Sequence, residues 1–136
     1  MWGPIFEKAW AKVKGNYLIS EGGFTEEGIF ALTGIPVFRY STVVGDTTFI
    51  QTLLTADLNN NIMAAGTGAG GDSTNNICNI SNSHAYSILS VFNITATNGT
   101  KIPVLMIRNP WGSCGSACYN GTLKSSDTFW TTTMIS

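Results

Sequence analysis

The chain is poor in charged residues and contains a single histidine, His84. Only 11% of its 136 residues are Asp, Glu, Lys or Arg, and these charges leave a net charge of −1. A typical soluble domain carries about 25% charged residues, so we expect Asn, Ser, Thr and Gly to supply much of the polar surface. No basic stripe is present that could neutralise phosphates, and we therefore expect no nucleic-acid partner.

Long apolar runs are also missing. No stretch approaches the roughly eighteen apolar residues that a membrane-spanning helix requires. The N-terminal stretch MWGPIFEKAWAKVKG carries Glu7, Lys8, Lys12 and Lys14 within its apolar pattern, unlike the uncharged core of a signal peptide. We therefore predict no membrane span and an intracellular, cytoplasmic location.

Cysteines are few and odd in number: Cys78, Cys114 and Cys118. This number does not make a disulfide framework, and one histidine cannot complete a usual zinc set with them. We interpret the three as free thiols in a reducing compartment, in preference to a bridge between Cys114 and Cys118. We predict no metal site built from these residues.

The first half of the chain has the periodicity of helices. Apolar residues recur at helical spacing over residues 3–14, between Pro4 at a first turn and Gly15 at a stop. A second helix is predicted from about Thr25, with acidic residues in its first turn and Gly34 beyond its end. A third is predicted from Asp46, which suits an N-cap, through Leu58.

The second half changes to strand-like patterns. IMAAG at 62–66 is predicted as a short strand, followed by a loop over 67–83. GTGAGG at 66–71 matches a dinucleotide fingerprint, but no helix pattern follows it, so we reject that function. HAYSILSVF at 84–92 and IPVLMIR at 102–108 are predicted to form a hairpin with Asn98 and Gly99 in its turn. Both strands are apolar on both faces, so we expect them to be central and covered.

This hairpin would bring His84, at the start of one strand, beside Asn109, at the end of the other. An asparagine carbonyl that accepts one imidazole N–H would orient the ring and leave the second nitrogen free to act. Trp111 would offer an apolar surface that keeps water from this hydrogen bond. Such a pair is typical of the orienting arm of a Cys-His-Asn arrangement, although a lone histidine is more often structural.

Several segments recur in an order known from one enzyme family. They are WGPIFEKAWAKVKGNY at 2–17, EGGFTEEGIFALTGIP at 21–36, HAYSI at 84–88, IRNPWG at 107–112, YNG at 119–121 and SSDTFW at 125–130. In this order they resemble the WPxxxEKAYAKxxGSY helix, the glycine pair with its E-x-x-x-x-LTG helix, the histidine strand, the asparagine strand and the weaker motifs that follow. The chain thus resembles the calpain family of cysteine endopeptidases, in the second half of the catalytic core.

The resemblance implies an α+β fold: the second subdomain of a papain-like cysteine protease, with an antiparallel, partly barrelled β-sheet and flanking helices. Residues 1–136 would form one such subdomain, a portion of a larger catalytic core. His84 would be the general base, Asn109 its orienting residue and Trp111 their shield. Gly22, Gly23 and Ser83 would line the substrate cleft, with Ser83 standing where the family has glycine.

The chain also departs from the family. The nucleophilic Cys and the oxyanion-hole Gln belong to an upstream half, and no Q-G-x-C segment is present here. The family's calcium site is doubtful, because Cys118 occupies the position of an acidic ligand and Asp127 alone remains, while calcium prefers six to eight oxygens. We expect no other cofactor.

Two functions follow from these features. The first is the His/Asn-bearing half of a calpain-like cysteine endopeptidase, which cleaves protein substrates once a Cys-bearing half, in the same precursor or in a separate chain, completes it. The alternative is a catalytically inactive, calpain-like structural or interaction module in a larger assembly. The residue at the upstream Cys position discriminates between them.

Overall fold

The computed structural model describes residues 1–42, 46–76, 78–114, 118–124, 126–128 and 130. Contacts divide the chain into two compact units, Met1–Arg39 and Tyr40–Ser136. The assignment of residues 1–136 to one subdomain therefore stays a prediction. Within the described ranges, no helix is both long and apolar enough to cross a membrane.

The first unit contains two helices, both of which the sequence predicted. Helix α1 spans Trp2–Lys14 and ends at Gly15, whose φ of 114° is open to glycine and whose N–H donates to Ala11 at 2.9 Å. Helix α2 spans Thr25–Thr33 and ends at Gly34, whose left-handed backbone sends its N–H to Phe30 at 2.7 Å. Glycine stops thus explain both C-terminal boundaries.

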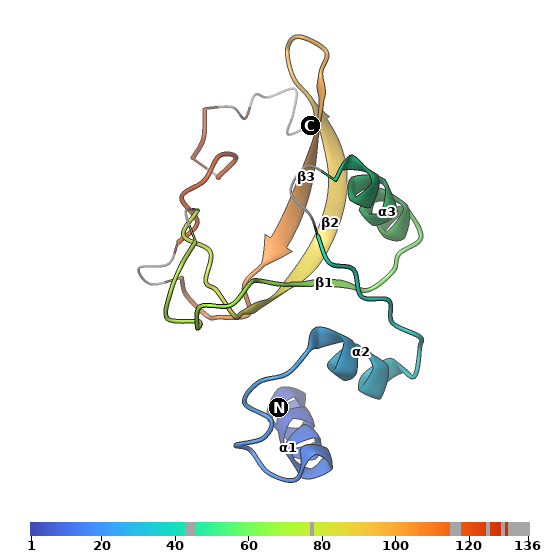
Figure 1. Ribbon diagram of the computed structural model, residues 1–136, viewed down its shortest axis with the longest axis vertical. Coiled ribbons are helices and arrows are strands. Elements are labelled where there is room, and N and C mark those ends of the chain that lie inside the picture. The colour runs from blue at the N-terminus through green and yellow to red at the C-terminus, as the bar shows by residue number, and fades with distance from the viewer. Residues whose placement is uncertain (43–45, 77, 115–117, 125, 129, 131–136) are drawn as a thin grey trace. The chain divides into compact units, whose positions relative to one another are not determined.

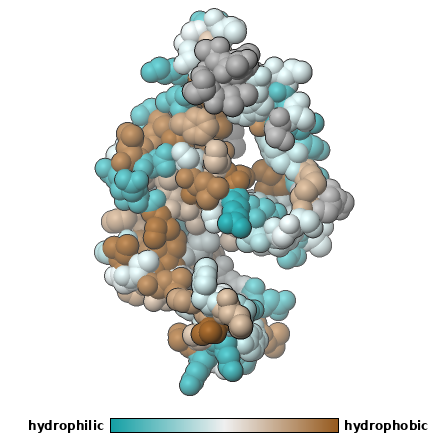
Figure 2. Space-filling model, turned by 180° about the vertical axis from the view of Figure 1, so that it is seen from behind, coloured by the Kyte–Doolittle hydropathy of each residue, from teal (hydrophilic) through white to brown (hydrophobic). Residues whose placement is uncertain are grey.

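Few apolar side chains are buried within this first unit. Lys14 forms an ion pair with Glu27, and Arg39 forms another with Glu26 at 3.0 Å. Such surface pairs contribute at most about 1 kcal/mol each. Apolar side chains are open to solvent at many places on the surface (Figure 2); those of α1 are Trp2, Ile5, Phe6 and Val13. The apolar face that predicted α1 correctly is therefore not covered within its own unit.

Helix α3 opens the second unit and spans Thr47–Leu58, as predicted. Asp46 caps it: the carboxylate accepts hydrogen bonds from the main-chain N–H groups of Thr48 and Phe49. The Thr48 hydroxyl donates to the same carboxylate at 2.6 Å and, with these main-chain bonds, holds the pKa of Asp46 below its ordinary value. The cap is thus in its accepting, ionised form at neutral pH.

An antiparallel sheet of three strands follows, in the order β1-β2-β3 (Figure 1). The strands span Met63–Gly66, Ala85–Thr95 and Lys101–Arg108. The predicted hairpin of β2 and β3 is confirmed, with Gly99 at φ 82° in its turn and Asn98 accepting the N–H of Thr100. Strand β2 extends to Thr95, further than the sequence predicted.

The prediction that both hairpin strands are central and covered is wrong for β3. Strand β2 is central and alternates between buried and exposed residues, but β3 is an edge strand whose last four residues are exposed. In the described part of the chain the sheet is also open, so the predicted partial barrel is not present there. The coarser prediction, an α+β fold with an antiparallel sheet, is confirmed.

The core of the second unit lies between α3 and β2. Leu53, Ile88 and Val91 are buried together, and Phe49, Leu54, Met63 and Ala65 pack against them. In Figure 1, α3 lies alongside β2, and the turn between β2 and β3 extends beyond α3. One helix and one face of the central strand therefore form the core of this unit.

Asp57 ties α3 to β2 at an irregularity in the sheet. Pairing between β2 and β3 shifts between Ile88 and Ser90. Beside this shift the Asp57 carboxylate accepts the Ser90 hydroxyl at 2.9 Å and the Val91 N–H at 3.2 Å. Without the Asp57 carboxylate, these two partly buried donors would lose this hydrogen-bond acceptor.

Replacement of Asp57 is therefore expected to destabilise the second unit. Asp57→Ala should lower the free energy of unfolding by about 1–3 kcal/mol, the cost of leaving buried donors unpaired. Urea unfolding would measure this, with the exposed Asp72→Ala as the matched control, expected within about 0.5 kcal/mol of the parent. Equal stabilities of the two variants would contradict the role of Asp57.

Candidate active site

His84 and Asn109 meet at one end of the β2–β3 hairpin. His84 directly precedes β2 and Asn109 directly follows β3, and Ser87 pairs with Arg108 in the ladder between them. The His84 Nε2 atom lies 2.9 Å from Asn109 Oδ1. The predicted adjacency is thus found, across 25 residues of sequence.

The identity of the acceptor assigns the tautomer of the ring. Asn109 Oδ1 also accepts the main-chain N–H of Trp111 at 3.1 Å, so it is an acceptor in both contacts. His84 Nε2 must then carry the proton and donate to it. Asn109 therefore has its amide orientation set by Trp111 and in turn sets the orientation of His84.

Two aromatic rings flank the half-buried imidazole. The Trp111 ring lies with its centroid 4.4 Å from that of His84, at a tilt of 41°. The Tyr86 ring meets His84 edge-to-face, with centroids 4.8 Å apart. Trp111 is itself 37% exposed, so it covers the ring on one side while one side of the tryptophan remains in solvent.

This arrangement leaves the other nitrogen, Nδ1, available for chemistry. Within the described residues Nδ1 has no hydrogen-bond partner in the chain. A neutral imidazole with a fixed Nε2–H offers Nδ1 as a proton acceptor, and once protonated it can stabilise an adjacent anion such as a thiolate. The pair can thus serve as an oriented general base.

The contacts of Tyr86 and Thr67 were not predicted, although one of them could have been. Tyr86 stands two residues after His84, and residues two apart on a strand face the same side of a sheet. Thr67 contacts the main chain of His84 with its hydroxyl, at 2.9 Å from the His84 nitrogen. No sequence pattern reveals this contact, because it depends on how β1 pairs with β2.

The three predicted cleft residues fall in different units. Ser83 precedes His84 and has a φ of 46°, in the left-handed region that favours glycine. Its hydroxyl accepts the N–H of Gly71 at 3.2 Å. Gly22 and Gly23 belong to the first unit, so their place in a cleft with His84 stays a prediction.

The loop between β1 and β2 is closed by its own hydrogen bonds. An isolated bridge pairs Asn75 with Ser81, and Asn82 N–H donates to Thr74. The described residues from 67 to 83 contain turns and this bridge but no helix. The rejection of a dinucleotide fingerprint therefore agrees with the backbone, since no helix N-terminus follows the glycines.

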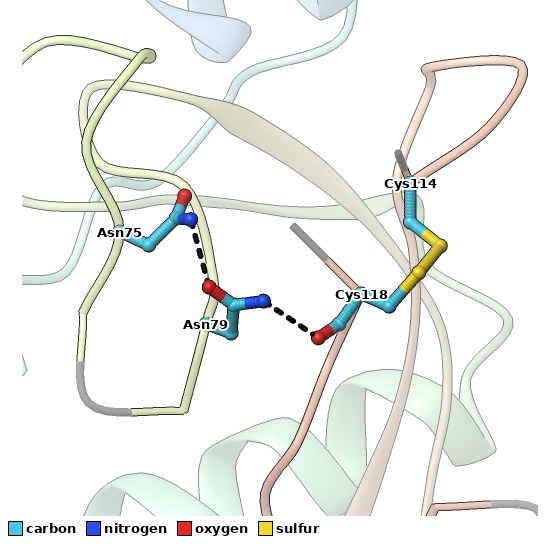
Figure 3. Close-up of a disulfide and its surroundings, with 4 residues drawn as sticks. All are labelled: Asn75, Asn79, Cys114 and Cys118. Atoms are coloured by element: carbon cyan, nitrogen blue, oxygen red, sulfur yellow. Dashed lines mark hydrogen bonds between the residues drawn. A yellow bond between two sulfur atoms is a disulfide. The ribbon is translucent and has the colours of Figure 1, made fainter. Parts of the chain in front are cut away.

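The prediction of three free thiols is wrong for two of them. Cys114 and Cys118 form a disulfide, with their Cα atoms 4.8 Å apart, while Cys78 is free. Figure 3 shows the Asn79 amide donating to the Cys118 carbonyl and accepting from Asn75. The spacing of four residues did not decide the matter, because only the backbone path can bring the two Cβ atoms together.

The disulfide is expected to stabilise the segment that follows the asparagine strand. In the chain-entropy model, a closed loop this short contributes about 2 kcal/mol. Cys114→Ser/Cys118→Ser should lose that stability in urea unfolding, and a reductant should have the same effect on the parent. Cys78→Ser is the matched control, and parent stability insensitive to reductant would contradict the bridge.

The residues do not fit a calcium site. Cys118 is held in the disulfide, and the Asp127 carboxylate accepts the N–H of Leu123 at 3.0 Å. In the described ranges, no group of three or more His, Cys, Asp or Glu could hold a metal ion. Calcium takes six to eight oxygen ligands, which Asp127 alone does not supply.

Comparison with known proteins bears on the whole chain. A model of the calpain family of cysteine proteases matches residues 1–135. Calpain-type cysteine protease DEK1 of Zea mays is 31% identical over 98% of this chain, and Calpain-A of Drosophila melanogaster is 31% identical over 95%. Calpain-9 of Homo sapiens is 26% identical over 95%.

These relatives are much longer than the chain. It spans 6% of the maize protein, 16% of the Drosophila protein and 19% of the human protein. The match therefore covers one part of each relative, and within this chain it includes both strands that carry His84 and Asn109. On the extent of the family match and the identities of these relatives, this chain belongs to the calpain family of cysteine proteases.

Proposed function

We propose that this chain is the histidine- and asparagine-bearing half of a papain-like cysteine endopeptidase core, which becomes active when a Cys-bearing half completes it. The observation that carries the proposal is the 2.9 Å contact from His84 Nε2 to Asn109 Oδ1, which leaves Nδ1 free. A structural histidine needs only a satisfied ring. Here one nitrogen is held and the other is presented, as a general base requires.

The nucleophile has to come from another segment. Cys114 and Cys118 are bonded to each other, and within the described residues the free Cys78 thiol is not a hydrogen-bond partner of the His84 ring. A thiolate from the Cys-bearing half would attack the peptide carbonyl carbon and form an acyl-enzyme. Nδ1 of His84 would first take the proton of that thiol and would give it to the leaving amine as the C–N bond breaks. It would then take a proton from the water that attacks the acyl-enzyme, which releases the acid product and the thiolate.

Asn109, Trp111 and the two glycines have different roles in this proposal. Asn109 holds the Nε2–H and keeps Nδ1 directed away from it. Trp111 covers this hydrogen bond and offers an aromatic face to the imidazolium. Gly22 and Gly23 would line the cleft: neither has a positive φ, and a Cβ at Gly22 would meet no other atom within 4 Å, so internal packing gives no reason for glycine there.

Exposed apolar surface supports a completing partner. Leu105, Met106 and Ile107 near the end of β3 are apolar and exposed, with Ile107 at 41%, and Arg108 links them to Asn109. In an isolated protein such a surface is a liability, and it suits a face that packs against another domain. The Cys-bearing half of the papain-like core would cover this surface.

Reconstitution tests the proposal. The complete polypeptide that carries these residues, or the chain mixed with a Cys-bearing half, would be assayed with a fluorogenic peptide before and after thiol alkylation. We expect cleavage that alkylation abolishes. A complete polypeptide with no Cys–aromatic pair after Gln-Gly, and with no cleavage, would contradict the proposal and favour the non-catalytic module.

A further inference from the structure

Thr67 contacts the main chain on both sides of the histidine. It follows the last residue of β1, and its hydroxyl lies 2.9 Å from the His84 nitrogen, 3.1 Å from the His84 oxygen and 2.8 Å from the Ser81 oxygen. The Thr67 N–H also donates to the His84 carbonyl at 3.0 Å. One threonine thus reaches both main-chain groups of His84.

Hydrogen-bonding capacity assigns these contacts. A hydroxyl has one proton to give and two lone pairs to accept with. Thr67 Oγ1 accepts the His84 N–H, and its own proton goes to the nearer carbonyl, that of Ser81. The His84 carbonyl already receives the Thr67 N–H, so all three main-chain groups are satisfied by this single residue.

The Thr67 side chain supplies a hydrogen bond that the β1–β2 ladder lacks beside His84. In a regular antiparallel pair, two opposed residues exchange both of their main-chain hydrogen bonds. Here Ser83 adopts a φ of 46° and gives its N–H to Gly68 at 2.7 Å, so the chain bends away from the ladder just before His84. The threonine hydroxyl replaces the second ladder bond across this bend.

The Thr67 hydroxyl is also connected, through Ser81, to the Tyr86 ring beside His84. Ser81, which is only 1% exposed, donates its N–H to the Tyr86 hydroxyl at 3.1 Å, and its carbonyl accepts the Thr67 hydroxyl. Tyr86 in turn lies edge-on to the His84 ring. Thr67 is therefore connected to the His84 ring by two routes. One is the main chain of His84, and the other runs through Ser81 and Tyr86.

We propose that Thr67 is a positioning residue for the His84 base: its hydroxyl fixes the main chain of His84 where the chain enters β2, and thereby keeps Nε2 within hydrogen-bond distance of Asn109. This inference rests on the function proposed above for its catalytic meaning. Its structural content, the dependence of the His84 ring on the Thr67 hydroxyl, does not need the enzyme to be active.

His84 is the only histidine of the chain, so imidazole ¹⁵N NMR gives signals from this ring alone. The variants are Thr67→Val, which keeps the shape and removes the hydroxyl, and Thr67→Ser, which keeps the hydroxyl. The matched control is Thr55→Val, which removes an exposed hydroxyl that bonds only within α3. Amide spectra would check that each variant folds.

We expect the parent ring to show the Nε2–H tautomer with a slowly exchanging proton. Thr67→Val should speed the exchange of that proton by about fivefold to tenfold, as expected for loss of one hydrogen bond. Thr67→Ser and Thr55→Val should behave like the parent. In the complete enzyme, Thr67→Val should lower kcat with little change in KM, and Thr67→Ser should restore it.

The outcomes separate the two proposals. An unchanged ring signal in Thr67→Val, with a changed signal in Asn109→Ala, would overturn the role of Thr67 and leave the proposed function standing. Unchanged cleavage in His84→Ala would overturn the function and leave the ring result. If Thr67→Val does not fold, hydrogen exchange of the parent protein provides the test. A His84 main-chain N–H that is not protected from exchange would overturn the role of Thr67.

Discussion

Exchange of His84 for alanine is expected to lower the kcat of the completed enzyme by at least about 10²- to 10⁴-fold, the usual contribution of a positioned acid–base group. The free nitrogen Nδ1 disappears, so nothing takes the thiol proton or returns one to the leaving amine. A peptide-cleavage assay with the parent and the variant would measure this loss directly.

The fold should survive this change. The main-chain bonds of His84 with Thr67 do not involve the imidazole, and the ring's bond to Asn109 contributes about 1 kcal/mol. Urea unfolding of His84→Ala should therefore shift only slightly. Peptide cleavage at the parental rate by a folded His84→Ala enzyme would refute the assignment of His84 as the base.

Replacement of Asn109 is expected to have a similar but smaller effect on kcat. Asn109→Ala keeps the base but frees the ring, so kcat should fall in the same direction and by less than in His84→Ala. Asn93→Ala provides the matched control, because Asn93 is exposed on the same strand pair near its other end. A similar loss in both asparagine variants would point to a general effect on the hairpin rather than to the ring.

The largest effect on stability is expected from the core between α3 and β2. Leu53 is 9% exposed and packs with Ile88 and Val91, so Leu53→Ala removes buried methyl groups and leaves a cavity beneath the central strand. We expect a loss of about 3 kcal/mol in the free energy of unfolding, within the range found for such core changes. Urea unfolding followed by tryptophan fluorescence would measure it.

The same helix supplies a control of equal chemistry. Leu58 ends α3 and is 83% exposed, so Leu58→Ala removes the same atoms from solvent-accessible surface and should change stability by less than about 0.5 kcal/mol. Because both changes also replace leucine by alanine in a helix, the difference between them isolates the core. Equal losses would show that Leu53 is not part of a packed core.

Local signals predicted the helices and the hairpin well. Gly15 and Gly34 mark helix ends because a positive φ suits glycine, and Asp46 caps α3 because its carboxylate reaches two N–H groups. The Asn98–Gly99 turn set the hairpin. These features involve residues close together in sequence, so their chemistry can be read without the rest of the fold.

Predictions that required burial or long-range contact were less successful. The apolar pattern of β3 suggested a covered strand, but an apolar side chain does not reveal whether a covering element lies opposite it. Cys114 and Cys118 carry no sign of their bond, because the backbone path between them decides it. Nothing in the glycine-rich sequence around Thr67 indicates its contact with His84, because that contact depends on the pairing of β1 with β2.

The sequence by itself determined the family, the order of the elements and the adjacency of His84 and Asn109, because motif identity, short-range periodicity and a hairpin turn depend on neighbouring residues. Only the tertiary structure decided the tautomer of the ring, its contact with Tyr86 and the hydrogen bonds of the Thr67 hydroxyl to the main chain of His84. Each of these depends on where strands far apart in sequence are placed to within a few tenths of an ångström, and hydrogen bonds are sensitive to such distances.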